Sequence, residues 1–359
     1  MSVQNGNDFL LTIFRFSMDM QRKTAVLLLN TGSPDAPTEE AVRSYLAEFL
    51  GDRRIVELPR WKWWPILHGL ILRRRPAKSA VRYQGVWTEE GSPLIVHSRK
   101  TAEGLAKRLD GVEVYLAMRY GNPSVPDIMD TIIASGVKQL LVVPMFAQYA
   151  AQTTAATFDA VSAEMAARRD MPALRFIHDY HDDPAYIRAL RRNIEAYWAK
   201  HGAPMSVGGR LVMSFHGIPQ KSSDLGDVYE EQCRRTARLL ADALKLSDSD
   251  WLLTFQSRFG HDPWLQPYTL PTVEQLAAEG LPRIDVVCPG FAADCLETIE
   301  EIDDELRHAY EDGFVSKIEN GRGGEFHYIP ALNESEIGLD AYETIIRREL
   351  GGWIAEPSA

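Results

Sequence analysis

Short runs of consecutive apolar residues recur along the chain and set its predicted architecture. The run at 24–30 stops at the turn residues 31–34, which is typical of a strand buried on both faces of a parallel sheet. Runs of the same character lie at 112–118, 139–144, 174–178, 210–215, 252–256 and 284–288. The sequence therefore predicts a series of buried parallel strands.

Segments with a helical spacing of apolar residues separate most of these runs. Clear examples are 187–198 and 229–244. Alternating strands and helices favour right-handed βαβ units in a doubly wound sheet. With 359 residues the chain exceeds one ordinary domain of about 100 to 200 residues. We therefore expect two α/β domains that divide within 165–185.

Polar residues follow most of the predicted strands, and one of them is a histidine. In open α/β sheets, ligands bind at the carboxyl ends of the strands. His216 ends the run at 210–215, and Gly217 and Pro219 then break the chain into a loop. An imidazole there can ligate a metal or carry a proton near neutral pH. The alternative is a structural histidine that bonds a loop carbonyl.

Carboxylates line one side of a predicted helix after the run at 284–288. Glu297, Glu301 and Glu305 recur every four residues and drift by only about 40° per step around an α-helix. Such a row predicts a path for a divalent cation or for protons, although a solvated acidic face remains the alternative. Asp294 is the expected N-cap, with Glu297 completing a capping box. Cys295 is either a small buried residue or a soft metal contact.

Loops after other strands combine aromatic and basic residues. Trp264 can wall a flat macrocycle, and Arg258 can meet a carboxylate. The loops that contain Arg119, Tyr120 and Tyr149 have the same character. In each loop the alternative is a side chain that only anchors the chain.

The segment 61–75 is rich in aromatic and aliphatic residues and ends in three arginines. An apolar surface beside cations is typical of a protein that rests on an anionic membrane. A helix packed on the core with a solvated basic end is the alternative. The predicted lip residues are Trp61, Trp63, Trp64, Ile66 and Leu67.

Composition and charge narrow the function further. The net charge of −11 disfavours nucleic acid as a partner, because such partners require clustered Lys and Arg. The three cysteines lack the C-x-x-C spacing of a zinc or redox site and indicate a reducing compartment. No apolar run of about 18 residues is present to span a bilayer. A small-molecule or metal substrate fits these features.

Three separate motifs resemble those of ferrochelatases, in the same order. They are Ser214-Phe-His-Gly-Ile-Pro219, Phe255-Gln-Ser-Arg-Phe-Gly260 followed by Pro263-Trp-Leu265, and Cys288-Pro-Gly-Phe-Ala-Ala-Asp-Cys-Leu-Glu-Thr298. The resemblance covers nearly the whole chain, from residue 27 to the last helix. It implies two Rossmann-like domains with parallel sheets, of chelatase type, and a porphyrin cleft between them.

The resemblance also implies roles for individual residues. It places His216 and Glu297 at the metal, and Glu301 and Glu305 on the path to it. The acidic helix is expected to be π-type, which would bring residues spaced by four more nearly into line. The lip 61–75 is expected at the mouth of the cleft. The residues expected around the porphyrin are Thr31, Arg119, Tyr120, Tyr149, Arg258, Trp264 and Phe291.

Domain boundaries follow from the same comparison of motifs and strands. Residues 1–22 are expected to form a loose extension, 23–170 the first domain, and 171–335 the second domain with the metal site. A C-terminal helix and tail at 336–359 should pack back on the first domain.

The chain departs from the family pattern at several positions. Some ferrochelatases carry histidine where Cys295 stands. Others bind an iron–sulphur cluster through C-terminal cysteines, whereas 325–359 contains no cysteine, so no cluster is expected. Some relatives have two arginines after the tyrosine matching Tyr83, where this chain has Gln84 and Gly85.

The predicted function is insertion of Fe(II), as substrate, into protoporphyrin without a tightly bound cofactor. Coproporphyrin as substrate, a cobalt or nickel chelatase of the same fold, and a porphyrin or haem carrier are the alternatives. The expected location is cytoplasmic, with peripheral contact to the inner face of the membrane. The oligomeric state stays open.

Overall fold

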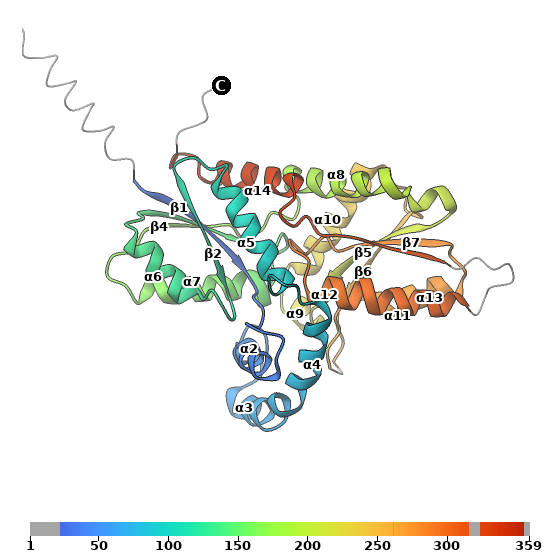
Figure 1. The fold of residues 1–359 in the computed structure, drawn as a ribbon, viewed down its shortest axis with the longest axis horizontal. Helices are drawn as coiled ribbons and strands as arrows, with labels where there is room; N and C mark the ends of the chain where they lie inside the picture. Colours follow the sequence, from blue (N-terminus) through green and yellow to red (C-terminus); the bar gives the residue numbers. More distant parts are fainter. Residues whose placement is uncertain (1–21, 261, 316–323, 355–359) are drawn as a thin grey trace, which may run out of the picture.

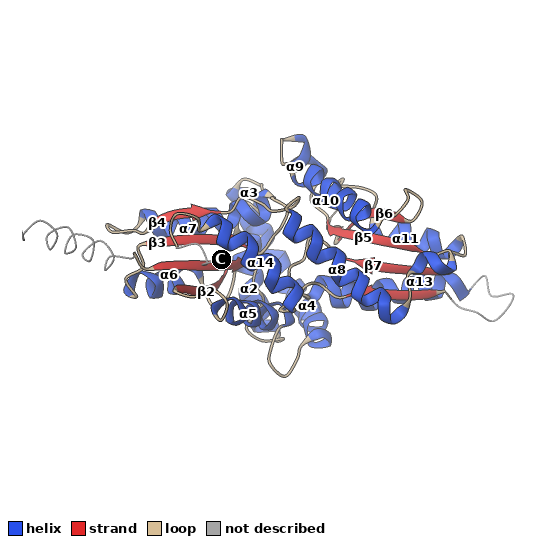
Figure 2. Cartoon of the chain, turned by 90° about the horizontal axis from the view of Figure 1, so that it is seen from above, coloured by secondary structure: helices blue, strands red, loops and turns tan. Residues whose placement is uncertain are grey.

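The computed structural model describes residues 22–260, 262–315 and 324–354, which form two α/β units placed end to end (Figures 1 and 2). Each unit holds a four-stranded parallel sheet, in the orders β2-β1-β3-β4 and β6-β5-β7-β8. The predicted fold class of two Rossmann-like domains with parallel sheets is confirmed. The strands are β1 Thr24–Asn30, β2 Val112–Met118, β3 Gln139–Pro144, β4 Ala173–Phe176, β5 Arg210–His216, β6 Trp251–Gln256, β7 Arg283–Val287 and β8 Glu325–Ile329.

Helices cover the two sheets and connect their strands (Figure 2). Three segments, η1, η2 and η4, are π-helices, and η3 is a 3₁₀-helix. In chain order the helices are α2 Glu39–Gly51, α3 Arg60–Ile66, η1 Leu67–Ile71, α4 Leu72–Val86, α5 Pro93–Ala106, α6 Val125–Ala134, η2 Ala151–Ala155, α7 Ala156–Ala166, α8 Pro184–His201, η3 Pro204–Val207, α9 Gln220–Asp224, α10 Tyr229–Leu244, α11 Thr269–Ala278, α12 Leu296–Thr298, η4 Ile299–Leu306, α13 Arg307–Val315 and α14 Glu336–Glu349.

The central strands are buried along their whole length and are mostly apolar, because both faces of each sheet are covered. Every residue of β1, β3 and β7 is buried. β1 pairs in parallel with β2 on one side and β3 on the other, with Thr24 opposite Val112 and Gln139. This burial on both faces explains why the strands appear in the sequence as continuous apolar runs.

The structure corrects two features of the predicted division. β4 pairs with β3 and completes the first sheet, whereas a boundary after residue 170 assigned this strand to the second domain. β8 pairs with β7 and was not predicted. β8 is an edge strand that begins with an exposed glutamate and contains a histidine, so it lacks the apolar run of a central strand. The predicted extension at 1–22 lies almost wholly outside the described residues.

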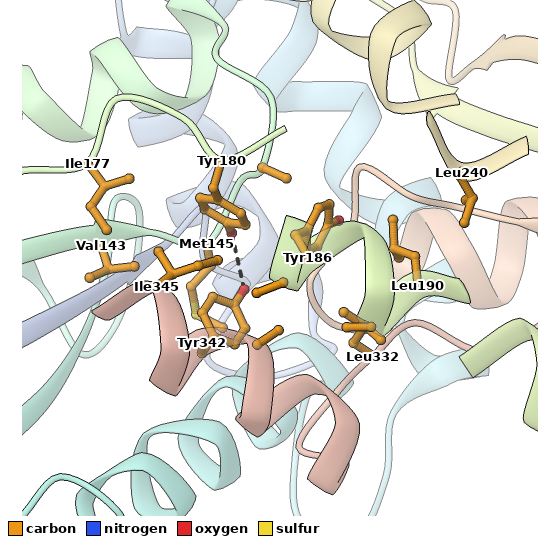
Figure 3. Close-up of a cluster of buried hydrophobic side chains, with 14 of the residues drawn as sticks. Val143, Met145, Ile177, Tyr180, Tyr186, Leu190, Leu240, Leu332, Tyr342 and Ile345 are labelled. Carbon is orange, nitrogen blue, oxygen red and sulfur yellow. Dashed lines mark hydrogen bonds between the residues drawn. The ribbon is translucent and has the colours of Figure 1, made fainter. Parts of the chain in front are cut away.

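One apolar core runs from the first sheet into the second. It includes Leu28 of β1 and Met213 of β5, with α8 and α14 between them. Figure 3 shows its middle, where the hydroxyls of Tyr180 and Tyr342 lie 3.2 Å apart. The C-terminal helix also contacts the first domain through Arg108, which pairs with Asp340 at 2.8 Å. The two sheets are therefore joined by buried side chains.

Helices α2, α3 and α4 project from the junction of the two sheets (Figure 1). β1 ends where the chain turns toward α2, and β7 ends before α12, so the carboxyl ends of both sheets face the same central region. Within the described residues, no helix is both long enough and apolar enough to cross a membrane.

Candidate metal centre

His216 is the last residue of β5, and within the described residues only one of its ring nitrogens has a hydrogen-bond partner. Its Nδ1 lies 2.6 Å from the carbonyl oxygen of Gly217. A carbonyl only accepts hydrogen bonds, so Nδ1 carries the proton and Nε2 keeps its lone pair. The Tyr229 hydroxyl donates to the His216 carbonyl at 2.9 Å and fixes the strand end. The loop-carbonyl bond of the structural alternative is present, and it leaves Nε2 available to a metal or a proton.

Two aromatic rings flank this imidazole. The rings of Trp264 and Phe291 each have their centroid 6.4 Å from that of His216. Gly217 allows this close packing, because a Cβ there would lie 2.9 Å from the Gln256 carbonyl oxygen and 3.1 Å from the Trp264 ring. The structure thus brings together three residues that were predicted from separate motifs.

The acidic helix begins differently from the prediction. Cys295 is the N-cap, and its backbone N–H donates to the Thr298 hydroxyl at 2.9 Å, so the capping box expected from Asp294 and Glu297 is wrong. Asp294 is buried one residue earlier. Its carboxylate accepts hydrogen bonds from the hydroxyls of Thr298 and Tyr328, the amide of Asn333 and the backbone N–H of Ala331. These contacts hold the start of the helix against β8 and the segment that follows it.

Glu297 is therefore free of a capping role. The Gln256 side chain donates to its backbone carbonyl at 2.8 Å, which ties it to the end of β6. Burial raises the pKa of the Cys295 thiol well above its usual range, and the neighbouring Glu297 carboxylate adds to the shift. In the metal-free protein, Cys295 is thus a neutral thiol beside the Glu297 carboxylate.

Glu301 is held by the loop that follows β6. Its two carboxylate oxygens accept bonds of 2.6 Å from the backbone N–H and the hydroxyl of Ser257. Ser257 adopts a left-handed backbone conformation, with φ of 64°, as the strand ends. Burial raises the pKa of Glu301, while the hydrogen bonds from Ser257 oppose the rise, as would a second proton on His216. Glu301 therefore belongs to the same electrostatic site as His216.

Glu305 has a different environment. Its side chain is 57% exposed and lies 3.1 Å from the Arg82 guanidinium. Arg82 also pairs with Glu300, through Nε at 2.6 Å and through Nη2. The π-helix η4 is observed as the resemblance implied, but the carboxylates are not one uniform row. Glu301 faces Ser257, and Glu305 faces Arg82.

The sequence as a whole matches known proteins. The family model described as Ferrochelatase matches residues 23–350. Ferrochelatases from Azoarcus sp. (strain BH72) and Bordetella pertussis are 50% and 49% identical, over 92% of this chain and 89% of each relative. The chain belongs to the ferrochelatase family.

Solved structures agree on the fold. SirB from Bacillus subtilis with Fe³⁺ superposes with a TM-score of 0.52, covering 92% of this chain and 96% of that one. A sirohydrochlorin chelatase SirB in complex with cobalt gives 0.53, covering 91% and 95%. Both are 11% identical in sequence, so they support the chelatase-like architecture alone.

The predicted porphyrin-binding residues of the first domain form hydrogen bonds mainly with other residues of that domain. Arg119 pairs with Asp52 and donates through Nε to the Ala156 carbonyl at 2.8 Å. The Tyr120 hydroxyl donates to the same aspartate at 2.9 Å, and only 1% of this tyrosine is exposed. Because its side chain is buried, Tyr120 has almost no surface with which to make the predicted contact to a porphyrin. Thr31 is half-buried, and its carbonyl accepts the Tyr120 backbone N–H.

Other predicted porphyrin residues are more open. Tyr149 is half-buried, and its ring stacks on His178 with centroids 4.3 Å apart. Arg258 is exposed, with its guanidinium 4.9 Å from the centre of the Tyr268 ring. The alternative to a membrane lip, a packed helix with a solvated basic end, would leave Arg75 in solvent. It is half-buried instead, with its guanidinium 4.6 Å from the Phe259 ring, and no ion pair to it occurs among the described residues.

The five predicted lip residues divide between surface and core. Trp61 is 75% exposed, and Trp64 and Ile66 are each 42% exposed. Trp63 and Leu67 are buried, and the Trp63 indole donates to the Leu50 carbonyl at 2.7 Å, so their assignment to the lip is wrong. Helical geometry turns Trp63 and Leu67, which are four residues apart, inward and leaves the residues between them exposed.

Sequence reasoning missed several residues that shape the site. Ser257 lay within a quoted motif but has no distinctive residue chemistry. Arg82 and Glu300 meet across 218 positions in the chain, so no local pattern could pair them. Asp179, His181 and Asp182 also come together as possible metal ligands, but Asp179 already accepts hydrogen bonds from His178 and His181.

Proposed function

We propose that the protein inserts ferrous iron into protoporphyrin IX, with release of two protons, as the last step of haem biosynthesis. The observation that carries this proposal is the free Nε2 of His216 between Trp264 and Phe291 and within the electrostatic reach of Glu301. Metalation needs a base for the pyrrole protons and anionic ligands for the cation. These groups supply both.

His216 receives the pyrrole protons at Nε2, and Glu297 holds the iron. The bond between Nδ1 and the Gly217 carbonyl stabilises the imidazolium that forms, because Nδ1 remains a donor in both states. Glu301 lowers the cost of that charge and passes ions outward, and Glu305 connects the path to solvent. Membership of the ferrochelatase family supports these roles.

The porphyrin is held by aromatic walls and by cations for its carboxylates. Trp264, Phe291 and Tyr149 contact the ring, with Thr31 and Arg119 on the first-domain side. The guanidiniums of Arg75 and Arg258, which form no ion pair within the described part of the chain, meet the propionates. Binding energy from these contacts supports the bent macrocycle that exposes its nitrogen lone pairs.

Protoporphyrin is the proposed substrate because the exposed lip is apolar. Trp61, Trp64 and Ile66 suit contact with a membrane from which a poorly soluble porphyrin is drawn. Arg60 and Lys62 lie 5.1 and 5.0 Å from the Trp64 and Trp61 rings and suit anionic lipid. We place the protein in the cytoplasm, peripheral on the inner face of the membrane, with no tightly bound cofactor and no iron–sulphur cluster.

The decisive experiment is an anaerobic assay of the purified protein with Fe(II) and either protoporphyrin or coproporphyrin, followed by the haem spectrum. A higher kcat/KM for protoporphyrin is expected. Faster turnover of coproporphyrin would assign the other substrate, and preference for cobalt or nickel would assign another chelatase. Haem binding without turnover would indicate that the protein is a porphyrin or haem carrier.

A further inference from the structure

Arg82 connects helix α4 to the acidic π-helix η4. It lies on α4, which contacts both α12 and η4 across the junction of the two domains (Figure 1). Its guanidinium donates to Glu300 through two nitrogens, one of them at 2.6 Å. One of these nitrogens also lies 3.1 Å from Glu305. A single cation therefore binds two carboxylates of the acidic helix.

The π-helical turn makes this double contact possible. Hydrogen bonds in a π-helix run from residue i to i+5, so residues five apart lie near one side of the helix. Glu300 and Glu305 have this spacing and share Arg82. Glu301 turns instead to Ser257. Among the residues that the structure describes, Glu305 at the outer end of the proposed path thus forms an ion pair, and Glu301 at the inner end forms none.

The two contacts of Arg82 differ in strength. Glu300 receives two hydrogen bonds, and its side chain is only 14% exposed. Glu305 receives one longer bond, and its side chain is 57% exposed. Two-point contacts between guanidinium and carboxylate are the stronger kind, whereas an exposed single pair contributes about 0 to 1 kcal/mol. Glu305 can therefore exchange Arg82 for another cation while Glu300 keeps Arg82 in place.

We propose that Arg82 is a charge gate that sets the apparent affinity for ferrous iron at the outer end of the carboxylate path. This inference rests on the proposed function. An arginine keeps its charge at every physiological pH, so it repels an approaching divalent cation until Glu305 is released. Arg82 is a positioning residue, because it touches the carboxylates and not the reacting atoms.

The test compares Arg82→Gln with Arg82→Lys and with Lys78→Gln as the matched control. Lys78 is exposed on the same helix and makes no ion pair within the described part of the chain, so its replacement removes one charge from α4 without freeing a carboxylate. Initial rates are measured against Fe(II) at saturating porphyrin, at low ionic strength and at about 0.5 M salt.

Arg82→Gln should lower the KM for Fe(II) by about three- to tenfold at low ionic strength, because two carboxylates lose their counterion. The difference should shrink in high salt, the KM for porphyrin should keep its value, and Arg82→Lys and Lys78→Gln should resemble the parent. A KM for Fe(II) that is unchanged or raised, or that falls equally in Lys78→Gln, overturns the gate.

Two further results separate the possible causes of failure. If Arg82 were only a structural tie between domains, Arg82→Gln would lower the unfolding temperature and alter the KM of both substrates. If the unaltered protein forms no haem from Fe(II) and porphyrin, the proposed function fails first. If the protein forms haem but the KM for Fe(II) does not change in Arg82→Gln, the gate proposal alone fails.

Discussion

The carboxylate of Glu301 accepts two hydrogen bonds of 2.6 Å from Ser257, one from the backbone N–H and one from the hydroxyl. This contact links the loop after β6 to the π-helix and fixes the carboxylate at the end of β6. Burial raises the pKa of Glu301, and a proton on His216 would oppose that rise, so the two side chains interact electrostatically. The first two predictions test this pair of residues, His216 and Glu301.

Replacing His216 with alanine should lower kcat for haem formation by about two orders of magnitude or more, because it removes the base proposed to accept the pyrrole protons. Folding should survive, since the ring's hydrogen bond reaches only the adjacent residue. The measurement is the anaerobic haem assay, with thermal unfolding as a check. His308→Ala, at an exposed position on α13, is the matched control and should keep full activity. A folded His216→Ala protein with parental rates would remove His216 from the mechanism.

Replacing Glu301 with glutamine should lower activity and raise stability at neutral pH. Burial raises the pKa of Glu301 above its unfolded value, so its stabilising contribution is present below that unfolded value and is lost as the pH rises through the folded one. The neutral amide avoids this loss. Its oxygen can accept from the Ser257 backbone N–H, and its NH2 can donate to the Ser257 hydroxyl oxygen once that hydroxyl turns. We expect a Tm gain of about 1 to 2 °C at pH 8 and little gain at pH 4.

The comparison for this prediction is Glu311→Gln, which removes an exposed carboxylate from α13. It should change neither Tm nor rate. A Glu301→Gln protein that is less stable than the parent at pH 8 would show that the ionised carboxylate is net stabilising.

Asp294→Asn should destabilise the second domain by about 2 to 4 kcal/mol. The buried carboxylate accepts four hydrogen bonds, and an amide has only one accepting oxygen and adds two donors that face donors. Urea unfolding measures the loss. Asp312→Asn, at an exposed position, is the control. Equal midpoints for the two variants would contradict the structural role given to Asp294.

The double change of Trp61 and Trp64 to serine should reduce binding to vesicles of phosphatidylglycerol and phosphatidylethanolamine by about tenfold or more, because both indoles are exposed on the lip. Sedimentation with vesicles measures it. Phe158→Ser removes an exposed ring from α7, which is not part of the lip segment, and should leave binding unchanged. If the double variant binds as the parent does, the lip is no membrane contact.

Local patterns predicted much of this molecule. Buried strands need continuous apolar runs, so β1, β3, β5 and β7 were found from the sequence, and the loop after β5 placed His216 at a strand end. β8 was missed because an edge strand needs no such run. The wrong assignment of β4 arose because a strand's own residues do not say which sheet accepts it.

The sequence by itself determined the α/β class, the order of the motifs and the residue types available for metal chemistry, because these depend on short-range periodicity and composition. Only the tertiary structure decided which groups meet. It placed Trp63 in the core and Trp61 on the surface. It also buried Asp294 as a hydrogen-bond acceptor in place of an N-cap, and it paired Glu305 with Arg82. Such pairings join residues far apart in the chain, and their geometry depends on how whole helices and sheets pack.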